Sequence, residues 1–240
     1  MNKPQLDHIP EAKPSATVVL LRETDNHIEV LMLQKNSTIN YGGSWVFPGG
    51  VCDQQDYVSA DRLLGNREIE NVARITASRE AMEEAGLELN PLEMAAFAHW
   101  TTPEFRIKRY AAWFLIADAR QLNQPVVIDQ GEIVQARWLR PAQAIAEQAS
   151  GSMLLNGPSF VTLSQLTSFS SVEDAIASYQ KKTVEFFEPR GYKTDQGMLT
   201  LYHGDSEYDL DQQPTDKPES AHRLHMLKEG AWSYLNHRGV

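Results

Sequence analysis

Apolar runs separated by polar turns near the start of the chain predict β-strands. Residues 15–34 hold two apolar runs separated by a polar break at 24–26, which predicts two strands joined by a turn. A shorter apolar segment at 44–50 ends in Pro-Gly-Gly, which predicts a strand that stops at a tight loop. Polar residues 51–66 predict no regular element, and we interpret them as an insertion.

Apolar residues recur at helical spacing from about Glu68 to Ala85, and Gly86 follows as a stop signal, so a long helix is predicted there. Short aromatic and aliphatic segments predict strands, and segments opened by proline or a capping residue predict helices. The strands are expected at 93–99, 109–116 and 136–139, and the helices at 141–148, 158–166 and 172–181. Ser171 and Asp174 form a predicted capping box for the last helix.

The tail from residue 183 contains two predicted hairpins. One pairs residues 184–187 with 198–202, and the other pairs 223–227 with 231–235 around a glycine. Two prolines in the acidic segment 205–219 predict a loop. Strands and helices are therefore interleaved, which predicts an α/β (α+β) fold with a domain at 1–182 and a β-rich extension at 183–240 packed on it.

Composition limits the classes of function. The 240 residues fit one large domain or one domain with an appended module, and the 42% hydrophobic content is that of a globular protein. The net charge of −10 has the wrong sign for binding the backbone of duplex nucleic acid. An acidic chain can still act on an anionic substrate if bound cations reverse the local field, so a metal site is expected.

The chain carries a single cysteine, Cys52, which suits a reducing compartment and supplies no zinc-ligand cluster. The segment Met1–Pro14 lacks the apolar core of a signal peptide, and no run reaches the roughly 18 apolar residues of a membrane span. The C-terminal tripeptide matches no retention or peroxisomal signal. A cytoplasmic protein without a membrane partner is predicted.

Three carboxylates, Glu80, Glu83 and Glu84, lie at i, i+3 and i+4 of the predicted long helix and therefore share one side of it. Like charges at this spacing repel, and Mg²⁺ or Mn²⁺ bound between them would remove that penalty. The alternative is an exposed, charged helix face. The preceding Gly49 and Gly50 favour the metal site, because bare glycines allow the backbone to approach a phosphate.

These residues resemble the Nudix box, G-x5-E-x7-R-E-U-x-E-E-x-G-U, whose second half fits from Arg79 to Leu87. Anchored on Gly50, the box spans about residues 50–87 with an insertion at about 57–70, and Asp56 falls where the first glutamate belongs. Anchoring on Gly65 restores the spacing but puts Asn71 at the acidic position. The resemblance implies an α/β/α sandwich with a mixed sheet.

The resemblance extends to the peroxisomal-type coenzyme A diphosphatases, which carry an insertion at this point of the box. It rests on segments spread over most of the chain, namely 77–86, 100–103, 137–142, 203–208 and 223–234. One departure concerns the strand after Pro103, where residues 108–115 lack the acidic and second basic positions usual in the subgroup. That departure bears on the substrate more than on the reaction.

The resemblance also implies roles for individual residues. Glu83 and Glu84 would be the principal ligands of Mg²⁺ or Mn²⁺, Glu80 a ligand or orienting carboxylate, and Arg79 their salt-bridge partner. Asp56 would be a further metal ligand. Glu132 stands where relatives place a catalytic base, and an exposed loop carboxylate is the alternative.

Basic residues in this acidic chain are candidates for binding the substrate's phosphates. They are Lys35 and the cluster Arg106, Lys108 and Arg109, which join Gly49 and Gly50 as predicted substrate-binding residues. A solvated strand edge is the alternative for the cluster.

The predicted function is hydrolysis of a phosphoanhydride in coenzyme A or acyl-coenzyme A. A second candidate substrate is ADP-ribose or another nucleotide sugar or dinucleotide, and a different class is an inactive nucleotide sensor or protein-binding module. The expected partner is a small-molecule nucleotide or coenzyme A derivative, with a homodimer left open as the assembly.

Overall fold

The computed structural model describes residues 9–25, 27–38 and 42–237. Within these ranges a nine-stranded mixed sheet has the order β8-β3-β2-β1-β6-β5-β9, with β4 paired to β1 and β7 to β2. Its strands are β1 (Lys13–Thr24), β2 (His27–Lys35), β3 (Ser44–Val46), β4 (Gly49–Val51), β5 (Ala95–Thr101), β6 (Tyr110–Asp118), β7 (Ile133–Leu139), β8 (Leu154–Leu155) and β9 (Glu185–Phe187). β1 runs parallel to β6 and antiparallel to β2.

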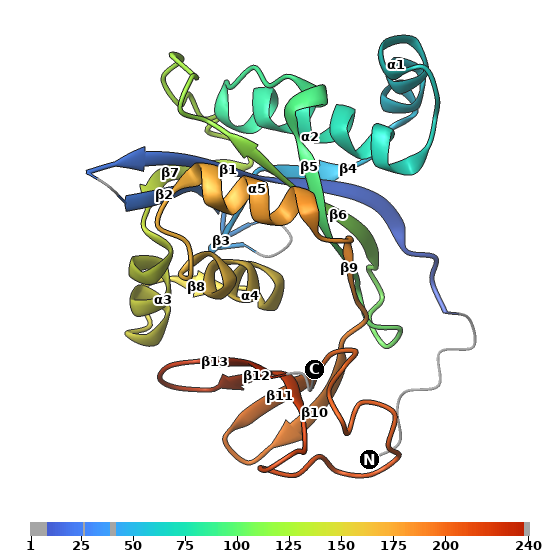
Figure 1. Cartoon of the computed structure of the whole chain (residues 1–240), viewed down its shortest axis with the longest axis vertical. Coiled ribbons are helices and arrows are strands. Elements are labelled where there is room, and N and C mark those ends of the chain that lie inside the picture. The colour runs from blue at the N-terminus through green and yellow to red at the C-terminus, as the bar shows by residue number, and fades with distance from the viewer. Residues whose placement is uncertain (1–8, 26, 39–41, 238–240) are drawn as a thin grey trace.

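Helices cover both faces of this sheet (Figure 1). One face carries α2 (Ile69–Ala85), and the other carries α3 (Pro141–Ala149), α4 (Gly157–Leu166) and α5 (Val172–Lys181). Successive side chains of β1 point to opposite faces, so Val18 packs with the α2 cluster and Val19 with the α4 and α5 cluster. The predicted α/β fold with helices on both sides of a mixed sheet is confirmed.

A stripe of small residues fixes α2 against β1. Ala73, Ala77 and Ala81 recur every four residues, are fully buried, and pack on Ala16 and the neighbouring residues of β1. Their small side chains allow the helix to approach the sheet closely, and the left-handed Gly86 (φ 67°) ends it. The predicted helix and its stop are therefore confirmed, and the helix carries its carboxylates on the sides of this stripe.

The segment 51–66 contains a helix that the sequence analysis did not predict. α1 (Gln54–Leu64) begins at a capping box in which Asp53 and Asp56 each accept a backbone N–H from the other, and it ends at Gly65. Ala60 of α1 packs against Val72 of α2. The insertion is therefore an ordered helix that rests on the outer side of α2.

The tail departs from prediction in its first hairpin. Residues 184–187 do not pair with 198–202, because β9 adds to the large sheet parallel to β5 and Phe187 stacks on Trp100 at 3.9 Å between ring centroids. The antiparallel second sheet contains β10 (Arg190–Thr194), β11 (Gly197–Leu201), β12 (Ala221–Leu227) and β13 (Ser233–His237). The predicted pairing of 223–227 with 231–235 is confirmed in the β12–β13 hairpin.

The second sheet packs on the same hydrophobic core as the first. Tyr202 and Leu224 belong to the buried cluster that holds Phe160 of α4 and Phe187 of β9. Figure 1 places β10–β13 as a layer beside α3 and α4, on the side away from α2. Residues 205–219 form the predicted loop, which the buried Arg223 holds through Asp205, Glu207 and the carbonyl of Thr215.

Other predicted elements lie close to their expected places. The helices expected at 141–148, 158–166 and 172–181 are α3, α4 and α5, and the strand expected at 93–99 starts at Ala95, after a 3-10 turn at Pro91–Glu93. No helix in the described ranges combines the length and apolar character that crossing a membrane requires. The expectations for most of the N-terminal segment and for the C-terminal tripeptide fall on residues 1–8 and 238–240, outside the described residues.

Candidate functional site

The three carboxylates of α2 differ strongly in exposure. The side chain of Glu84 is 5% exposed and that of Glu80 is 13% exposed, whereas Glu83 is 57% exposed. Ala77 and Ala81 pack α2 against β1. Glu80 and Glu84 lie beside this contact, and Glu84 reaches the backbone of Gly49 after β3. The predicted shared side of the helix therefore has a buried part, Glu80 and Glu84, and an exposed rim, Glu83.

Glu84 is a buried carboxylate of which one oxygen accepts a hydrogen bond. Its Oε2 accepts the backbone N–H of Gly49 at 2.9 Å, and its Oε1 is buried and accepts no hydrogen bond from any residue that the structure describes. Lys35 Nζ lies 3.8 Å from that oxygen, which is beyond hydrogen-bond distance. Burial raises the pKa of Glu84 to about 8, although the Gly49 N–H and Lys35 oppose the shift. A buried carboxylate oxygen without a donor costs free energy until a cation neutralises it.

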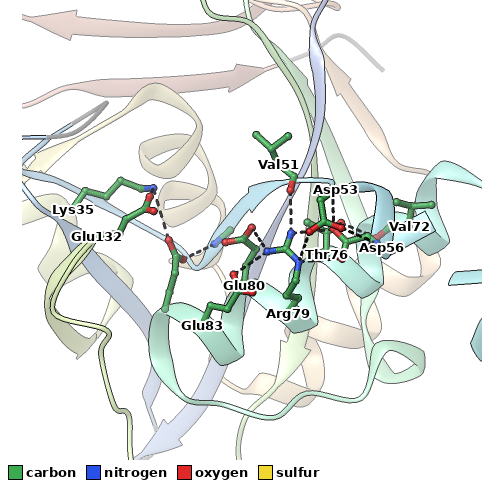
Figure 2. A network of polar contacts seen from close by, with 12 residues as sticks. Lys35, Val51, Asp53, Asp56, Val72, Thr76, Arg79, Glu80, Glu83 and Glu132 are labelled. Atoms are coloured by element: carbon green, nitrogen blue, oxygen red, sulfur yellow. Dashed lines mark hydrogen bonds and ion pairs between the residues drawn. The ribbon is translucent and has the colours of Figure 1, made fainter. Parts of the chain in front are cut away.

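Arg79 connects the carboxylates of α2 with α1 and with the end of β4 (Figure 2). Its Nη1 donates to Glu80 at 2.8 Å and to Glu83 at 2.9 Å, while Nε and Nη2 donate to the two oxygens of Asp56 at 3.1 and 3.0 Å. Nη2 also donates to the carbonyl of Val51 at the end of β4. The predicted salt-bridge role of Arg79 matches these contacts, which fix the orientation of two carboxylates.

Asp56 binds the guanidinium of Arg79 through both carboxylate oxygens. Its side chain is 2% exposed and accepts hydrogen bonds from Arg79, from the Thr76 hydroxyl at 2.9 Å and from the Asp53 N–H at 3.0 Å. Burial alone would raise its pKa, but these donors hold the pKa of Asp56 below its usual range. Because both oxygens are occupied by protein donors, the geometry does not fit the predicted metal ligand.

Gly49 and Gly50 are required by close approaches of the neighbouring chain. A Cβ on Gly50 would overlap the carboxylate of Glu80, and a Cβ on Gly49 would overlap the carbonyl oxygen of Ala16 on β1. The glycines therefore let β4 pass directly beside the acidic helix. Their backbone borders the same cavity as the Glu80 side chain.

Lys35 and Glu132 form a hydrogen-bonded ion pair beside the acidic helix (Figure 2). Burial alone would lower the pKa of Lys35, but its hydrogen bond to Glu132 and the charge of Glu84 raise it. Glu132 is half exposed and lies in a loop held by Asp129, whose carboxylate accepts the N–H groups of residues 131–133. Lys35 at the end of β2 and Glu132 in the loop before β7 therefore lie together beside α2.

The basic cluster after β5 divides into different environments. Arg106 lines the cavity, with its guanidinium 5.4 Å from the centroid of the Phe105 ring. Arg109 donates to the carbonyls of Pro10 at 2.8 Å and Thr102 at 3.1 Å, so its side chain joins two backbone segments and does not face a substrate. Lys108 is exposed and does not line the cavity. Only Arg106 of this cluster has the predicted location.

A cavity of about 680 Å³ opens beside these residues, which is the size range of small-molecule sites. Among the described residues, its charged lining consists of Lys35, Glu80, Arg106 and Glu132. A second set of lining residues was missed by the sequence analysis and comes from the second sheet: Gly191, Met198, Thr200, Tyr202, Leu224 and Met226. Their alternation along β11 and β12 was visible in the sequence, but the wall that they form depends on a distant pairing.

The donor set suits a hard divalent cation. Carboxylate oxygens are the ligands that Mg²⁺ and Mn²⁺ prefer, and Oε1 of Glu84, which accepts no hydrogen bond from a described residue, is an oxygen available to one. Across the residues that the structure describes, no three His, Cys, Asp or Glu side chains already stand together as a complete ligand group. Arg79 holds Glu80 and Glu83 in hydrogen bonds that a bound cation would compete with.

Comparisons with known proteins identify the family and the fold. Residues 12–154 match the family model of the NUDIX domain. The structure resembles a NUDIX hydrolase from Alicyclobacillus acidocaldarius with a TM-score of 0.65 and 19% identity, over 73% of this chain and 100% of that chain. A likeness at this identity shows a shared fold.

Two further solved structures are more distant. The NUDIX domain of Shewanella oneidensis NrtR, complexed with ADP ribose, has a TM-score of 0.49 and 16% identity over 66% of this chain and 88% of that one. A C. elegans Ap4A hydrolase has a TM-score of 0.42 and 18% identity over 66% and 97% of the two chains. No curated protein matches the chain significantly.

Proposed function

Because the chain belongs to the Nudix family, whose hydrolases act on phosphorus-containing anhydrides with divalent metal ions, we propose that it is a Mg²⁺- or Mn²⁺-dependent coenzyme A or acyl-coenzyme A diphosphatase. The observation that carries the hydrolytic part is the buried Oε1 of Glu84, to which no described residue donates a hydrogen bond, on the same helix that presents Glu80 to the cavity beside Gly49 and Gly50. The likeness of segments 100–103 and 203–208 to the coenzyme A diphosphatases supports the substrate.

In this proposal Glu84, Glu80 and Glu83 hold the metal. A bound divalent cation supplies charge neutralisation at the diphosphate and lowers the pKa of water at the site. Arg79 keeps Glu80 and Glu83 oriented through its two hydrogen bonds from Nη1. Asp56 in turn fixes Arg79 by accepting hydrogen bonds from Nε and Nη2. Asp56 is thus proposed as a positioning residue in place of the metal ligand expected from the box.

Lys35, Glu132 and Arg106 act on the substrate in this proposal. Glu132 accepts the proton of the attacking water, because it is half exposed and borders the cavity. The ion pair with Lys35 orients Glu132 at the cavity wall. Lys35 and Arg106 line the same cavity from separate elements and contribute positive charge to the phosphates.

The test is a substrate panel with purified protein and Mg²⁺, in which the products are identified by mass. Coenzyme A is expected to yield 3′,5′-ADP and 4′-phosphopantetheine. Release of AMP from ADP-ribose without any release of 3′,5′-ADP from coenzyme A would replace the proposed substrate while keeping the reaction type.

Two variants of the same helix separate catalysis from the sensor alternative. Glu84→Gln is expected to lower kcat by about 100-fold or more, whereas Glu70→Gln, at the partly exposed start of α2, is the matched control and is expected to keep the wild-type kcat. If Glu83→Gln and Glu84→Gln both left ligand binding and every measurable activity unchanged, the chain would be a sensor or binding module.

A further inference from the structure

Asp129 binds three consecutive backbone N–H groups of the loop that leads into β7. Its Oδ2 accepts the N–H of Gly131 at 3.2 Å and that of Glu132 at 2.7 Å, and its Oδ1 accepts the N–H of Ile133 at 2.8 Å. Burial alone would raise the pKa of Asp129, but these N–H groups hold the pKa below its usual range. One carboxylate therefore fixes the backbone on both sides of Glu132.

Asn36, directly after β2, fixes the same loop from its other side. Its backbone N–H donates to the carbonyl of Glu132 at 2.8 Å, and its side-chain Nδ2 donates to the carbonyl of Gly131 at 3.0 Å. Its Oδ1 accepts from the backbone N–H and the hydroxyl of Thr38, which orients the side-chain amide. The N–H and the carbonyl of both loop residues, Gly131 and Glu132, therefore have protein partners.

A β-bulge at the start of β7 makes the direction of Glu132 depend on this loop. The register between β2 and β7 shifts by one residue between Gln34 and Lys35, which lies opposite Ile133. Unbroken alternation would point Ile133 and Ala136 to opposite faces, yet both pack in the cluster beneath α2. A one-residue slip of this segment would reverse its side chains, and the bonds to Asp129 and Asn36 oppose such a slip.

We propose that Asp129 is a positioning residue of the hydrolysis, which holds the loop backbone so that the Glu132 carboxylate stays beside Lys35 at the cavity. This proposal rests on the role of base proposed above for Glu132. The side chain of Glu132 is 50% exposed, so its place depends on the backbone that carries it and on Lys35. Asp129 itself does not line the cavity, so its effect on turnover passes through the loop.

The proposal sets an order of turnover among variants. Glu132→Gln is expected to lower kcat by about 100-fold, the lower end of what general bases contribute. Asp129→Ala removes all three contacts to the loop and is expected to lower kcat about tenfold, because small displacements of a catalytic group are costly. KM should stay within about twofold of wild type. Asp129→Asn keeps one acceptor oxygen and should recover part of the loss, whereas a role of the charge alone would give both Asp129 variants the same kcat.

The experiment is a double-mutant cycle in kcat with coenzyme A and Mg²⁺, or with ADP-ribose if the substrate panel replaces coenzyme A. The double variant of Asp129→Ala and Glu132→Gln should have the kcat of Glu132→Gln within about twofold, because the positioned carboxylate is already absent. Asp118→Ala is the matched control. Asp118 also accepts the backbone N–H two residues later, that of Arg120 at 2.9 Å, but at the end of β6 that does not reach the cavity. This control should keep kcat unchanged with and without the Glu132 substitution.

Asn36→Ala covers the case in which Asp129→Ala folds poorly. It removes the side-chain bond to Gly131 and should lower kcat by a few-fold, again only when Glu132 is present. A wild-type kcat in Asp129→Ala, or an equal fold-loss from either variant with and without Glu132→Gln, would overturn the positioning role alone. A wild-type kcat in Glu132→Gln would overturn the proposed base together with it, while metal-dependent product release by that variant would keep the hydrolase function.

Discussion

Replacing Asp56 by asparagine tests whether this residue anchors Arg79 or binds metal. The carboxylate accepts two hydrogen bonds from Arg79 and one each from Thr76 and the Asp53 backbone. An asparagine keeps one acceptor oxygen, so it loses about half of these bonds and the charge that pairs with the guanidinium. Charge-assisted hydrogen bonds contribute about 1.5–3 kcal/mol each.

The expected loss is about 2–3 kcal/mol of unfolding free energy, because Arg79 is 25% exposed and solvent compensates part of its charge. For a chain of this size that corresponds to a Tm about 5–10 °C lower. Thr76→Val, which removes one neutral hydrogen bond to Asp56, is the matched control and is expected to cost about 1 kcal/mol.

The assay is urea unfolding of wild type, D56N and T76V in EDTA, so that metal does not contribute. A metal ligand behaves differently in this assay, since removing a carboxylate from an unoccupied cluster relieves repulsion. Unchanged or increased stability of D56N in EDTA, together with a loss of Mn²⁺ affinity of tenfold or more, would refute the anchoring role.

The pH dependence of the unfolding free energy is a second test of the role of Asp56. The hydrogen bonds from Arg79, Asp53 and Thr76 outweigh burial and keep the pKa of the folded carboxyl below 3.8. A depressed folded pKa stabilises the protein above the unfolded pKa of about 3.9, and this stabilisation is lost as the pH falls through the folded value. The stability difference between wild type and D56N should therefore narrow below about pH 4.

The remaining predictions concern the carboxylates, the glycine loop and the basic cluster. Glu84→Gln should lower kcat by about 100-fold or more while leaving stability in EDTA equal or higher, measured by turnover and urea unfolding, because it removes a buried charge without a complete set of partners. Gly50→Ala should lower kcat by about tenfold or more, since its Cβ displaces the Glu80 carboxylate. Arg106→Met should raise KM by about tenfold, and Lys108→Met, outside the cavity, should leave KM unchanged. Arg109→Met should instead lower unfolding free energy by about 1–2 kcal/mol at constant kcat, because it joins two backbone segments.

The long helix α2 was predictable because its signals are local. Apolar spacing, the glutamate pattern and the terminal glycine all lie between Glu68 and Gly86, and the structure has α2 over Ile69–Ala85. The helices after residue 140 were predictable for the same reason, since each opens with a proline or a capping side chain.

The insertion helix α1 was missed because its segment is polar and only Asp56 and Ala60 of the helix are buried. Its start signal was present, but Asp53 and Asp56 form a capping box with aspartate at both ends in place of the usual serine or threonine with glutamate. The same aspartate was assigned to the metal because the box pattern asks for an acid there. Sequence spacing cannot distinguish an acid that binds metal from one that binds the arginine.

The prediction of the first tail hairpin was wrong because strand pairing depends on residues that lie far apart in the sequence. Residues 185–187 pair with β5, almost ninety positions earlier in the chain, and the strand that forms a hairpin with β11 is the polar Arg190–Thr194, whose side chains are mostly exposed. The cavity wall on β11 and β12 was missed for the same reason. Alternation assigns Met198 and Met226 to one face of a strand but does not reveal what that face meets.

Glu84 is the centre of the proposed metal site for phosphoanhydride hydrolysis. Titration of Mn²⁺ into purified protein, followed by electron paramagnetic resonance, tests this directly when wild type is compared with E84Q and the control E70Q. If Glu84 binds the metal, wild type and E70Q bind Mn²⁺ with equal affinity and E84Q binds it at least about tenfold more weakly. Equal Mn²⁺ affinity in all three proteins would contradict it.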